Sequence, residues 1–279
     1  MKNVKTWLVT GASQGIGLEL VKQLLANGDN VIATTRNSKK LTDALSDFSP
    51  QLLAIDTDIT NESSIANAVM VGNIRFGTID YLINNAGYGL LGGIEECSAS
   101  EVQANFDINV FGLLNMTRAV LPIMREAGSG TIINISSVFG LIAGAGWGIY
   151  CATKFAVEAI SEALEQEIKP FGIKVIIIEP GYIRTAFLDS GSVITPANIV
   201  AEYTDIAEIR RKHKEDLPGT QAGDPVKVAS VIIKTALLNA PPLRLLLGSD
   251  AVQYATYKAD MLLTGIENNK KVSVSINYA

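Results

Sequence analysis

Two ionisable side chains, Tyr150 and Lys154, stand four positions apart in a stretch with helical periodicity. Residues at this spacing lie on one face of a helix, so the phenol and the ammonium group can interact. A phenol titrates at a pKa of about 10, and a neighbouring positive charge that favours the phenolate lowers that pKa. The pair therefore predicts that Tyr150 donates and accepts a proton in a reaction near neutral pH.

Spacing alone does not identify such a site, because the same Tyr-x-x-x-Lys pattern recurs at Tyr254 and Lys258. The two pairs differ in context. Thirteen positions before Tyr150 stands Ser137, just after a predicted strand, whereas the matching position before Tyr254 is Pro241. Open parallel sheets bind ligands at the carboxyl ends of their strands, where a hydroxyl can donate to a substrate oxygen. Without that context Ser137 is typical of a turn or a helix cap.

Another group of residues fits a nucleotide phosphate. Residues 10–17, TGASQGIG, follow a short apolar run and precede a stretch with helical periodicity. Gly11 permits the tight turn, Gly15 lets the backbone approach a pyrophosphate, and Gly17 allows close packing of helix on strand. The free N–H groups of the helix N-terminus attract the anion. The alternative is a tight turn without a ligand, which the flanking strand and helix make less favoured.

The end of the next predicted strand bears on the choice of nucleotide. Proteins that bind NAD usually hold the ribose 2′-hydroxyl with Asp or Glu about 20 residues after the glycines. Here Thr35 and Arg36 occupy that place, and no carboxylate accompanies them. A guanidinium beside a hydroxyl suits a 2′-phosphate, so the sequence predicts NADP(H) over NAD. The alternative for Arg36 is a solvated arginine after a strand.

The elements that must position these residues follow one rhythm, in which short apolar, β-branched runs alternate with longer helical stretches. We expect strands at 7–10, 30–35, 52–55, 81–84, 131–135, 175–179 and 244–247. Residues 175–178 are continuously hydrophobic, which is typical of a strand buried on both faces. The pattern predicts an α/β protein with a Rossmann-like doubly wound parallel β-sheet of about seven strands and helices on both faces, in a single domain over 1–279.

Residues 186–224 show no strand rhythm and are interpreted as a helical lid insertion over the substrate. Thr195 and Pro196 resemble an N-cap followed by proline at the first helical position. His213, the only histidine, stands in the charged cluster 210–216 and is expected on a solvated face.

Composition narrows the function classes further. The 279 residues carry 23 Lys and Arg against 28 Asp and Glu, a net charge of −5, which disfavours nucleic acid as a partner. Cys97 and Cys151 fit no disulfide framework, and with a single histidine they leave no metal site. No apolar stretch reaches the roughly 18 residues that a membrane helix needs. We therefore expect a cytoplasmic protein without a membrane or nucleic-acid partner.

The segment 102–124 reads as a helix that is apolar on more than one face. Such a helix must be covered on both sides, and a second copy of the chain on the outer side would form a two-fold homo-oligomer. Asn109 lies inside this segment, where an asparagine taken alone is most often satisfied locally.

Taken together, these motifs resemble those of the short-chain dehydrogenase/reductase family, from residue 5 to about 190. The family's elements occur in its order: TGASQGIG at 10–17, Asp58-Ile59, Asn84-Asn85-Ala86-Gly87, Asn109, Ser137, Tyr150, Lys154, and Pro180-Gly181-Tyr182-Ile183-Arg184-Thr185. The glycine spacing GxxxGxG is also the family's.

The resemblance implies a role for each catalytic residue. Tyr150 would be the acid and base, and Lys154 would hold the nicotinamide ribose and lower the pKa of the tyrosine. Ser137 would orient the carbonyl or hydroxyl group, and Asn109 would complete a proton relay through a bound water. The residues expected at the cofactor are Gly11, Ser13, Gln14, Gly15, Ile16, Gly17, Thr35, Arg36, Asp58, Ile59, Asn85, Ala86, Gly87, Tyr150, Lys154, Pro180, Gly181, Ile183 and Thr185.

The residues around the catalytic pair are mostly apolar, which predicts a hydrophobic substrate. The expected pocket residues are Val138, Leu141, Trp147, Tyr182 and Phe187. The sequence thus predicts an NADP(H)-dependent oxidoreductase that acts on a hydrophobic ketone or secondary alcohol, a carbonyl reductase, in a homodimer or homotetramer. A hydroxysteroid- or retinol-type dehydrogenase working mainly in oxidation is the alternative. A non-catalytic nucleotide-sensing protein is a remote one, since such relatives typically lose the tyrosine or lysine.

Overall fold

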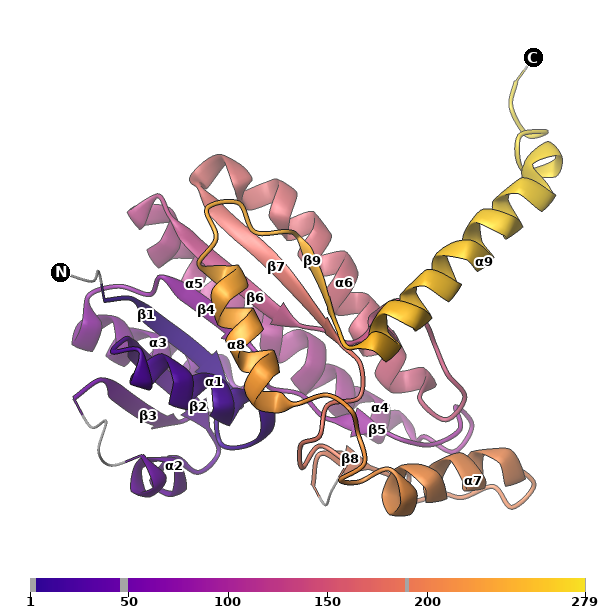
Figure 1. The fold of residues 1–279 in the computed structure, drawn as a ribbon, viewed down its shortest axis with the longest axis horizontal. Coiled ribbons are helices and arrows are strands. Elements are labelled where there is room, and N and C mark those ends of the chain that lie inside the picture. The colour runs from indigo at the N-terminus through magenta and orange to yellow at the C-terminus, as the bar shows by residue number, and fades with distance from the viewer. Residues whose placement is uncertain (1–3, 46–49, 189–190, 279) are drawn as a thin grey trace.

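The computed structural model describes residues 4–45, 50–188 and 191–278. Seven parallel strands form one sheet in the order β3-β2-β1-β4-β6-β7-β9 (Figure 1). They are β1 (Thr6–Thr10), β2 (Asn30–Thr35), β3 (Leu52–Asp56), β4 (Tyr81–Asn84), β6 (Gly130–Ile135), β7 (Ile173–Pro180) and β9 (Arg244–Leu247). Every predicted strand lies inside the observed one, so the predicted doubly wound parallel sheet is confirmed.

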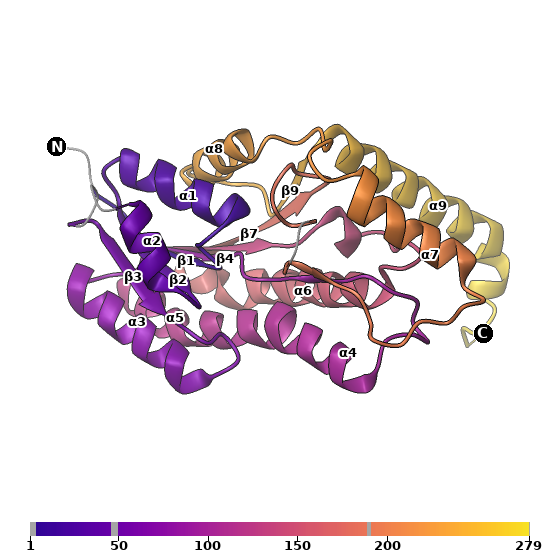
Figure 2. The same ribbon diagram turned by 90° about the horizontal axis from the view of Figure 1, so that it is seen from below.

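Helices cover both faces of the sheet (Figure 2). One layer contains α1 (Gly15–Ala26) and α8 (Pro225–Ala236), and the other contains α3 (Glu62–Phe76), α5 (Leu113–Ala127) and α6 (Gly148–Ile168). The chain builds outward from β1 through β2 to β3, then returns to place β4 on the other side of β1. The carboxyl ends of β1 and β4 therefore mark the point where strand order reverses, which is where open sheets of this kind bind ligands.

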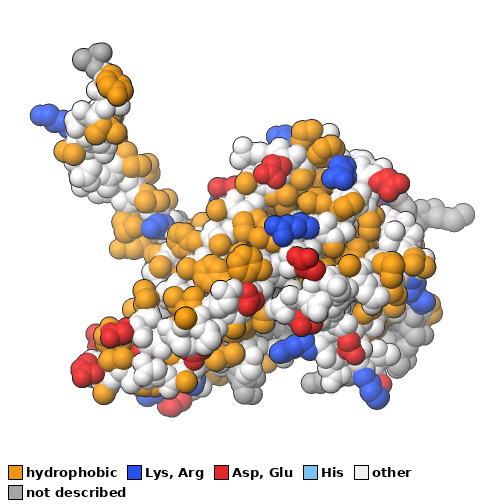
Figure 3. Space-filling view, turned by 180° about the vertical axis from the view of Figure 1, so that it is seen from behind, with side chains coloured by type: hydrophobic (Ala, Val, Ile, Leu, Met, Phe, Trp, Pro, Cys, Tyr) orange, Lys and Arg blue, Asp and Glu red, His pale blue; other side chains and the backbone are white. Residues whose placement is uncertain are grey.

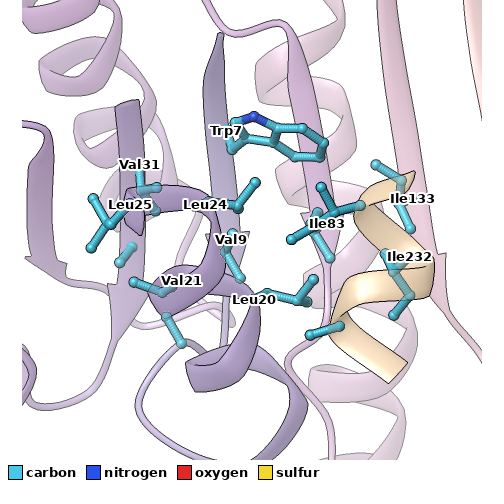
Figure 4. Packing of buried hydrophobic residues seen from close by; sticks show 14 of the residues in the cluster. Trp7, Val9, Leu20, Val21, Leu24, Leu25, Val31, Ile83, Ile133 and Ile232 are labelled. Atoms are coloured by element: carbon cyan, nitrogen blue, oxygen red, sulfur yellow. The ribbon is translucent and has the colours of Figure 1, made fainter. Parts of the chain in front are cut away.

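Strand β1 shows how the two layers divide the core. Trp7 and Val9 point into the layer with α1, while Leu8 points into the layer with α3 and α5. Figure 4 shows the first cluster, in which Leu20 and Leu24 of α1 lie over β1 and β4. Each fully buried side chain of this size contributes about 1.5–3 kcal/mol to folding, and this packing fixes where α1 begins relative to the end of β1.

The segment 102–124, predicted as one helix, is divided into three parts. These are α4 (Ala99–Phe106), a π-helix at Asp107–Gly112 and α5. The wider π turn inserts an extra residue, a feature often found at functional sites, and Asn109 lies inside it, buried.

The insertion 186–224 is only partly helical, and its residues 189–190 lie outside the described residues. Strand β8 (Val193–Ile194) pairs with β5 (Gly89–Leu90), and α7 (Thr204–Arg211) continues into a π-helix at Lys212–Asp216. The remaining helices are α2 (Ser38–Ala44), the short 3-10 turns Val138–Gly140 and Lys169–Phe171, and α9 (Ser249–Ser273).

The predicted helix start at Thr195 and Pro196 is wrong, because the backbone there bonds to another part of the chain. The amide of Ala197 donates to Glu101 Oε1 at 2.8 Å, and the amide of Val200 donates to Glu96 Oε1 at 3.1 Å. These carboxylates hold the segment in an irregular path, so the helix begins only at Thr204.

Helix α9 leaves the body after its first turn and projects away from it (Figure 1; upper left in Figure 3). Ala251 is its one buried residue in the described chain, and Tyr257, Leu262 and Ile266 are exposed along its length. Across residues 4–45, 50–188 and 191–278, no helix combines the length and apolar character needed to cross a membrane.

Candidate active site

A cavity of about 460 Å³ opens at the carboxyl ends of β1, β4, β6 and β7, a size typical of small-molecule sites. It extends from the glycine-rich turn to the lid insertion and brings most of the predicted site residues together. Those in its lining are Gly11, Gln14, Gly15, Ile16, Thr35, Arg36, Asp58, Ile59, Asn85, Ala86, Gly87, Ser137, Val138, Trp147, Tyr150, Lys154, Pro180, Gly181, Tyr182, Ile183, Thr185 and Phe187.

Four predicted site residues do not line the cavity. Gly17 is buried beneath the start of α1, and Asn109 lies behind the loop after β4. Ser13 is half-buried in the glycine-rich turn but away from the cavity. Leu141 follows the 3-10 turn Val138–Gly140 and is not among the lining residues, so its place in the pocket stays a prediction.

The glycine-rich turn has the close approach that a pyrophosphate needs. Gly11 and Gly15 adopt φ values of 63° and 56°, which favour glycine. A Cβ at Gly11 would lie 2.8 Å from Ala86 Cα. Asn85 fixes the turn through Nδ2, which donates to the carbonyls of Thr10 at 3.0 Å and Gly11 at 3.1 Å. This backbone fits the dinucleotide that the motif predicts.

The start of α1 offers N–H groups to that ligand. No side chain caps the helix, since Gln14 at the N-cap makes no such bond, and uncapped N-termini attract phosphate. The Gln14 amide instead donates to Ser192 Oγ at 2.7 Å and so ties the glycine-rich turn to the lid insertion.

The far end of the cavity carries the groups expected at the adenosine. Arg36 is exposed at the rim, and within the described residues no carboxylate forms an ion pair with it. Hydrogen bonds from the side chain and backbone of Thr60 lower the pKa of Asp58, which therefore stays ionised. The guanidinium of Arg36 and the carboxylate of Asp58 therefore both line this end of the cavity.

At the nicotinamide end, Tyr150 and Lys154 are both buried in the first turns of α6. Burial raises the pKa of Tyr150, partly offset by its hydrogen bond with Ser137. The expected lowering of this pKa by Lys154 is therefore not found. The ammonium lies 5.7 Å from the tyrosine ring centroid and donates to the Ile135 carbonyl at 2.8 Å instead.

Burial also acts on Lys154, whose pKa it lowers to about 8, while the nearby Glu158 carboxylate opposes the change. Desolvation disfavours the charged ammonium. At neutral pH the lysine is still mainly protonated, and the tyrosine carries its proton. The phenol can therefore donate its proton, and the ammonium group places a positive charge near the same end of the cavity.

Asn109 holds the loop that follows β4. Its Nδ2 donates to Tyr88 O at 2.9 Å and to Thr153 Oγ1 at 3.0 Å, and its Oδ1 accepts from Tyr88 N at 3.0 Å. A Cβ at Gly87 would lie 3.1 Å from this Oδ1 and 3.7 Å from Lys154 Nζ. The geometry shows a positioning role for Asn109 beside Lys154. The predicted relay through water stays a prediction.

Aromatic rings form the wall around the tyrosine. The ring centroid of Trp147 lies 5.5 Å from that of Tyr150, and the centroid of Phe187 lies 6.2 Å from it. Phe139, which the sequence reasoning missed, contacts Trp147, Tyr150 and Tyr182. An apolar wall at the reacting end suits a hydrophobic substrate.

The prediction for His213 is wrong. Its imidazole is half-buried and contacts Trp147 and Tyr182. The signal was present in the sequence as an amphipathic spacing: Ile206, Ile209, His213 and Leu217 recur at intervals of three and four. Arg210, from the same charged cluster, is also not solvated, since it forms a 2.6 Å ion pair with the buried Glu96.

The second Tyr-x-x-x-Lys pair lies on α9. Tyr254 is exposed there, and neither Tyr254 nor Lys258 lines the cavity. Tyr254 also follows a strand, β9, so the feature that distinguishes the two pairs is Ser137 at the end of β6, in the same cavity as Tyr150.

Comparison with known proteins gives the class to which this fold and site belong. The family model for short chain dehydrogenases matches residues 5–192. Oxidoreductase BOA17 of Botryotinia fuckeliana is 36% identical over 274 residues, which cover 97% of this chain and 98% of that protein. The chain therefore belongs to the short-chain dehydrogenase/reductase family, and it is an oxidoreductase of the kind that acts on CH–OH and C=O groups.

Two solved structures agree with this assignment. The crystal structure of a short-chain dehydrogenase from Streptomyces avermitilis has 38% identity and a TM-score of 0.91, covering 99% of this chain and 100% of its own. A short chain dehydrogenase from Burkholderia cenocepacia, solved in complex with NADP, has 26% identity and a TM-score of 0.73, covering 95% and 97%. A nicotinamide cofactor is thus supported for this fold.

Proposed function

We propose that this protein is an NADP(H)-dependent carbonyl reductase, which transfers hydride between the nicotinamide and a hydrophobic ketone or secondary alcohol. One observation carries the proposal: Tyr150, Ser137 and Lys154 line the same cavity as the uncapped glycine-rich turn, beneath an aromatic wall. A nucleotide-sensing protein would not need a buried proton donor at the nicotinamide end.

When bound, the cofactor supplies the hydride, and the protein's residues manage the proton and the orientation. Reduction of a carbonyl leaves an alkoxide that must be protonated as it forms. A phenol holds its proton at neutral pH, and burial of Tyr150 raises its pKa further; the phenol is therefore present as the proton donor, and the alkoxide, a much stronger base, can take that proton. The Ser137 hydroxyl can donate a hydrogen bond to the same oxygen and fix the carbonyl in place.

Lys154 and Asn109 serve this tyrosine and the ribose. The ammonium group of Lys154 lies within reach of both the Tyr150 ring and the loop at Gly87, where it can hold ribose hydroxyls. Asn109 fixes that loop through three hydrogen bonds. Orientation of this kind is a large part of enzymatic rate enhancement.

The preference for NADP(H) rests on Arg36, whose exposed guanidinium lies at the cavity rim without an ion-pair partner in the described chain. A 2′-phosphate offers it a charge-assisted contact. The preference for a hydrophobic substrate rests on Phe139, Trp147 and Phe187, which surround the tyrosine.

The proposal includes a homo-oligomer. Phe111 of the π-helix and Phe155 of α6 belong to neighbouring elements and are 46% and 40% exposed. Large apolar side chains exposed together mark interaction surfaces, and a second copy related by a two-fold axis would cover both. This surface continues the outer face of the segment 102–124.

The test is NADPH consumption with 2-decanone, acetophenone, ethyl acetoacetate and androstenedione, followed by the loss of NADPH absorbance and repeated with NADH. We expect at least one apolar ketone to be reduced, and faster with NADPH. Tight NADPH binding with no reduction of any ketone, and no oxidation of the matching alcohols by NADP⁺, would contradict the proposal.

A further inference from the structure

His213 connects the lid insertion to two residues of the cavity wall. Its Nε2 lies 2.9 Å from the Tyr182 hydroxyl and 3.3 Å from Trp147 Nε1, and its Nδ1 lies 2.8 Å from the Ile209 carbonyl oxygen. The histidine belongs to the π-helix Lys212–Asp216, whereas Trp147 precedes α6 and Tyr182 follows β7. One imidazole therefore joins three segments that are distant in sequence.

These contacts define a single protonation state of the ring. An indole N–H can only donate and a carbonyl oxygen can only accept. Nε2 must therefore be the unprotonated nitrogen that accepts from Trp147, and Nδ1 must carry the proton that is donated to Ile209. The Tyr182 hydroxyl then donates to the same Nε2 lone pair, which the two donors share, with the shorter contact to Tyr182. Burial lowers the pKa of His213 and so favours this neutral form.

We propose that His213 is a positioning residue of the substrate site, which holds Trp147 and Tyr182 in the cavity wall by accepting their hydrogen bonds at Nε2. Its effect on catalysis rests on the proposed function, whereas the contact itself does not.

The side chains packed around the imidazole show that the insertion 186–224 also contacts the cavity wall near Trp147. A Cβ at Gly146 would lie 3.4 Å from Ile209 Cγ2, so α7 already packs against the turn that carries Trp147. The Trp147 ring centroid lies 5.2 Å from that of His213 and 5.5 Å from that of Tyr150. A displacement of Trp147 would thus change the apolar wall beside the tyrosine, where the substrate is expected to bind.

Tyr182 is held from a second direction. Its backbone amide donates to Asp250 Oδ2 at 2.6 Å, at the start of α9. The side chain, however, has its hydroxyl contact at His213, and its ring lies 6.5 Å from that of Phe139. Loss of the imidazole would therefore free the tyrosine side chain while the backbone stays fixed.

Two substitutions distinguish the effect of the hydrogen-bond acceptor from the effect of the side-chain volume. His213→Gln keeps an acceptor atom near the position of Nε2, whereas His213→Leu keeps a similar volume and removes the acceptor. Lys212→Leu is the matched control, because Lys212 is the exposed neighbour in the same π-helix. Equal melting temperatures and circular dichroism spectra would show that each variant is folded.

The primary readout is acrylamide quenching of tryptophan fluorescence, which needs neither cofactor nor substrate. The chain has two tryptophans, of which Trp7 is 0% and Trp147 is 3% exposed. We expect the quenching constant to rise at least twofold in His213→Leu and to stay near the wild-type value in His213→Gln and Lys212→Leu. An unchanged constant in His213→Leu, or an equal rise in His213→Gln, would overturn the proposal.

A double-mutant cycle with Tyr182→Phe tests the pair directly. Removing the imidazole leaves the Tyr182 hydroxyl without this partner, and removing the hydroxyl leaves Nε2 with Trp147 alone. Because both substitutions remove the same contact, the combined effect should be smaller than the sum of the two. Additive effects on the quenching constant would overturn the coupling.

The kinetic readout uses acetophenone with NADPH. We expect KM to rise about fivefold in His213→Leu, because the loss of one hydrogen bond weakens substrate binding by about that factor. We expect kcat to change by less than twofold. A fall in kcat with KM unchanged would contradict a role in holding the substrate wall. If the wild type reduces no ketone, the proposed function fails, while the quenching result still decides the role of His213.

Discussion

Replacing Gly17 by alanine should damage the nucleotide site through one defined contact. A Cβ at this position would lie 2.5 Å from both Asn85 Nδ2 and Gly11 O. Ordinary contact needs about 1 Å more, so α1 must shift away from the end of β1 or Asn85 must move. Either movement breaks the hydrogen bonds from Asn85 to the carbonyls of Thr10 and Gly11.

The magnitude follows from these contacts. Overpacking costs about 1–3 kcal/mol, and two lost hydrogen bonds cost about 1 kcal/mol each. The higher helix propensity of alanine returns about 1 kcal/mol, which leaves a net loss of about 2–4 kcal/mol. For a chain of this size that corresponds to a melting temperature lower by about 5–15 °C. The displaced glycine-rich turn should also weaken NADPH binding by at least about tenfold.

Thermal melting and calorimetric titration with NADPH measure both effects. Gly265→Ala is the control, because a Cβ at Gly265 meets nothing within 4 Å and the residue lies in the projecting part of α9. It should melt at or slightly above the wild-type temperature and bind NADPH normally. Wild-type stability together with wild-type affinity in Gly17→Ala would refute the claim that this contact shapes the site.

Three further predictions concern charge, pH and assembly. Arg36→Ala should weaken NADPH binding about fivefold to tenfold and leave NADH binding unchanged, as titration with both cofactors will show; equal losses would argue against a 2′-phosphate contact. Because the pKa of Lys154 is lowered to about 8, the lysine is charged below that pH and neutral above it, so NADPH affinity should fall as pH rises through about 8, and a Lys154→Met variant should lack this inflection. Light scattering should give more than one chain's mass for the wild type and a smaller mass for Phe111→Glu/Phe155→Glu, whereas a monomeric wild type would refute the oligomer.

Much of the fold could be predicted because its signals are local. Runs such as 175–178 are hydrophobic without alternation, which identifies a strand buried on both faces wherever it lies. The convergence of Gly11 and Ser137 on one cavity follows from topology, because carboxyl ends of parallel strands share one edge, whereas Tyr150 lies in the first turn of the helix that follows. Sequence order and strand assignment were therefore enough to place them together.

Other features depend on contacts that spacing does not encode. The four-residue interval places Lys154 beside Tyr150, yet the ammonium bonds to Ile135 O, and burial dominates the pKa of the tyrosine. The path of the chain at Pro196 depends on carboxylates about a hundred residues earlier.

The charged cluster in the lid shows a different limit. Arg211 pairs with Glu208 and Asp216 on the exposed face, which is the arrangement expected for a solvated segment. His213 occupies the opposite side, toward Trp147. The density of charged residues therefore did not predict the burial of His213, whereas its spacing from Ile209 and Leu217 did.

The most direct test of the proposed mechanism compares Tyr150→Phe with Tyr254→Phe, since each removes the hydroxyl of a Tyr-x-x-x-Lys pair. The measurement is NADPH oxidation with a ketone that the wild type reduces, together with NADPH affinity by titration. We predict that Tyr150→Phe loses at least about a hundredfold in kcat while its NADPH affinity stays within about threefold, and that Tyr254→Phe retains wild-type turnover. Undiminished turnover in Tyr150→Phe would contradict the assignment of Tyr150 as the proton donor.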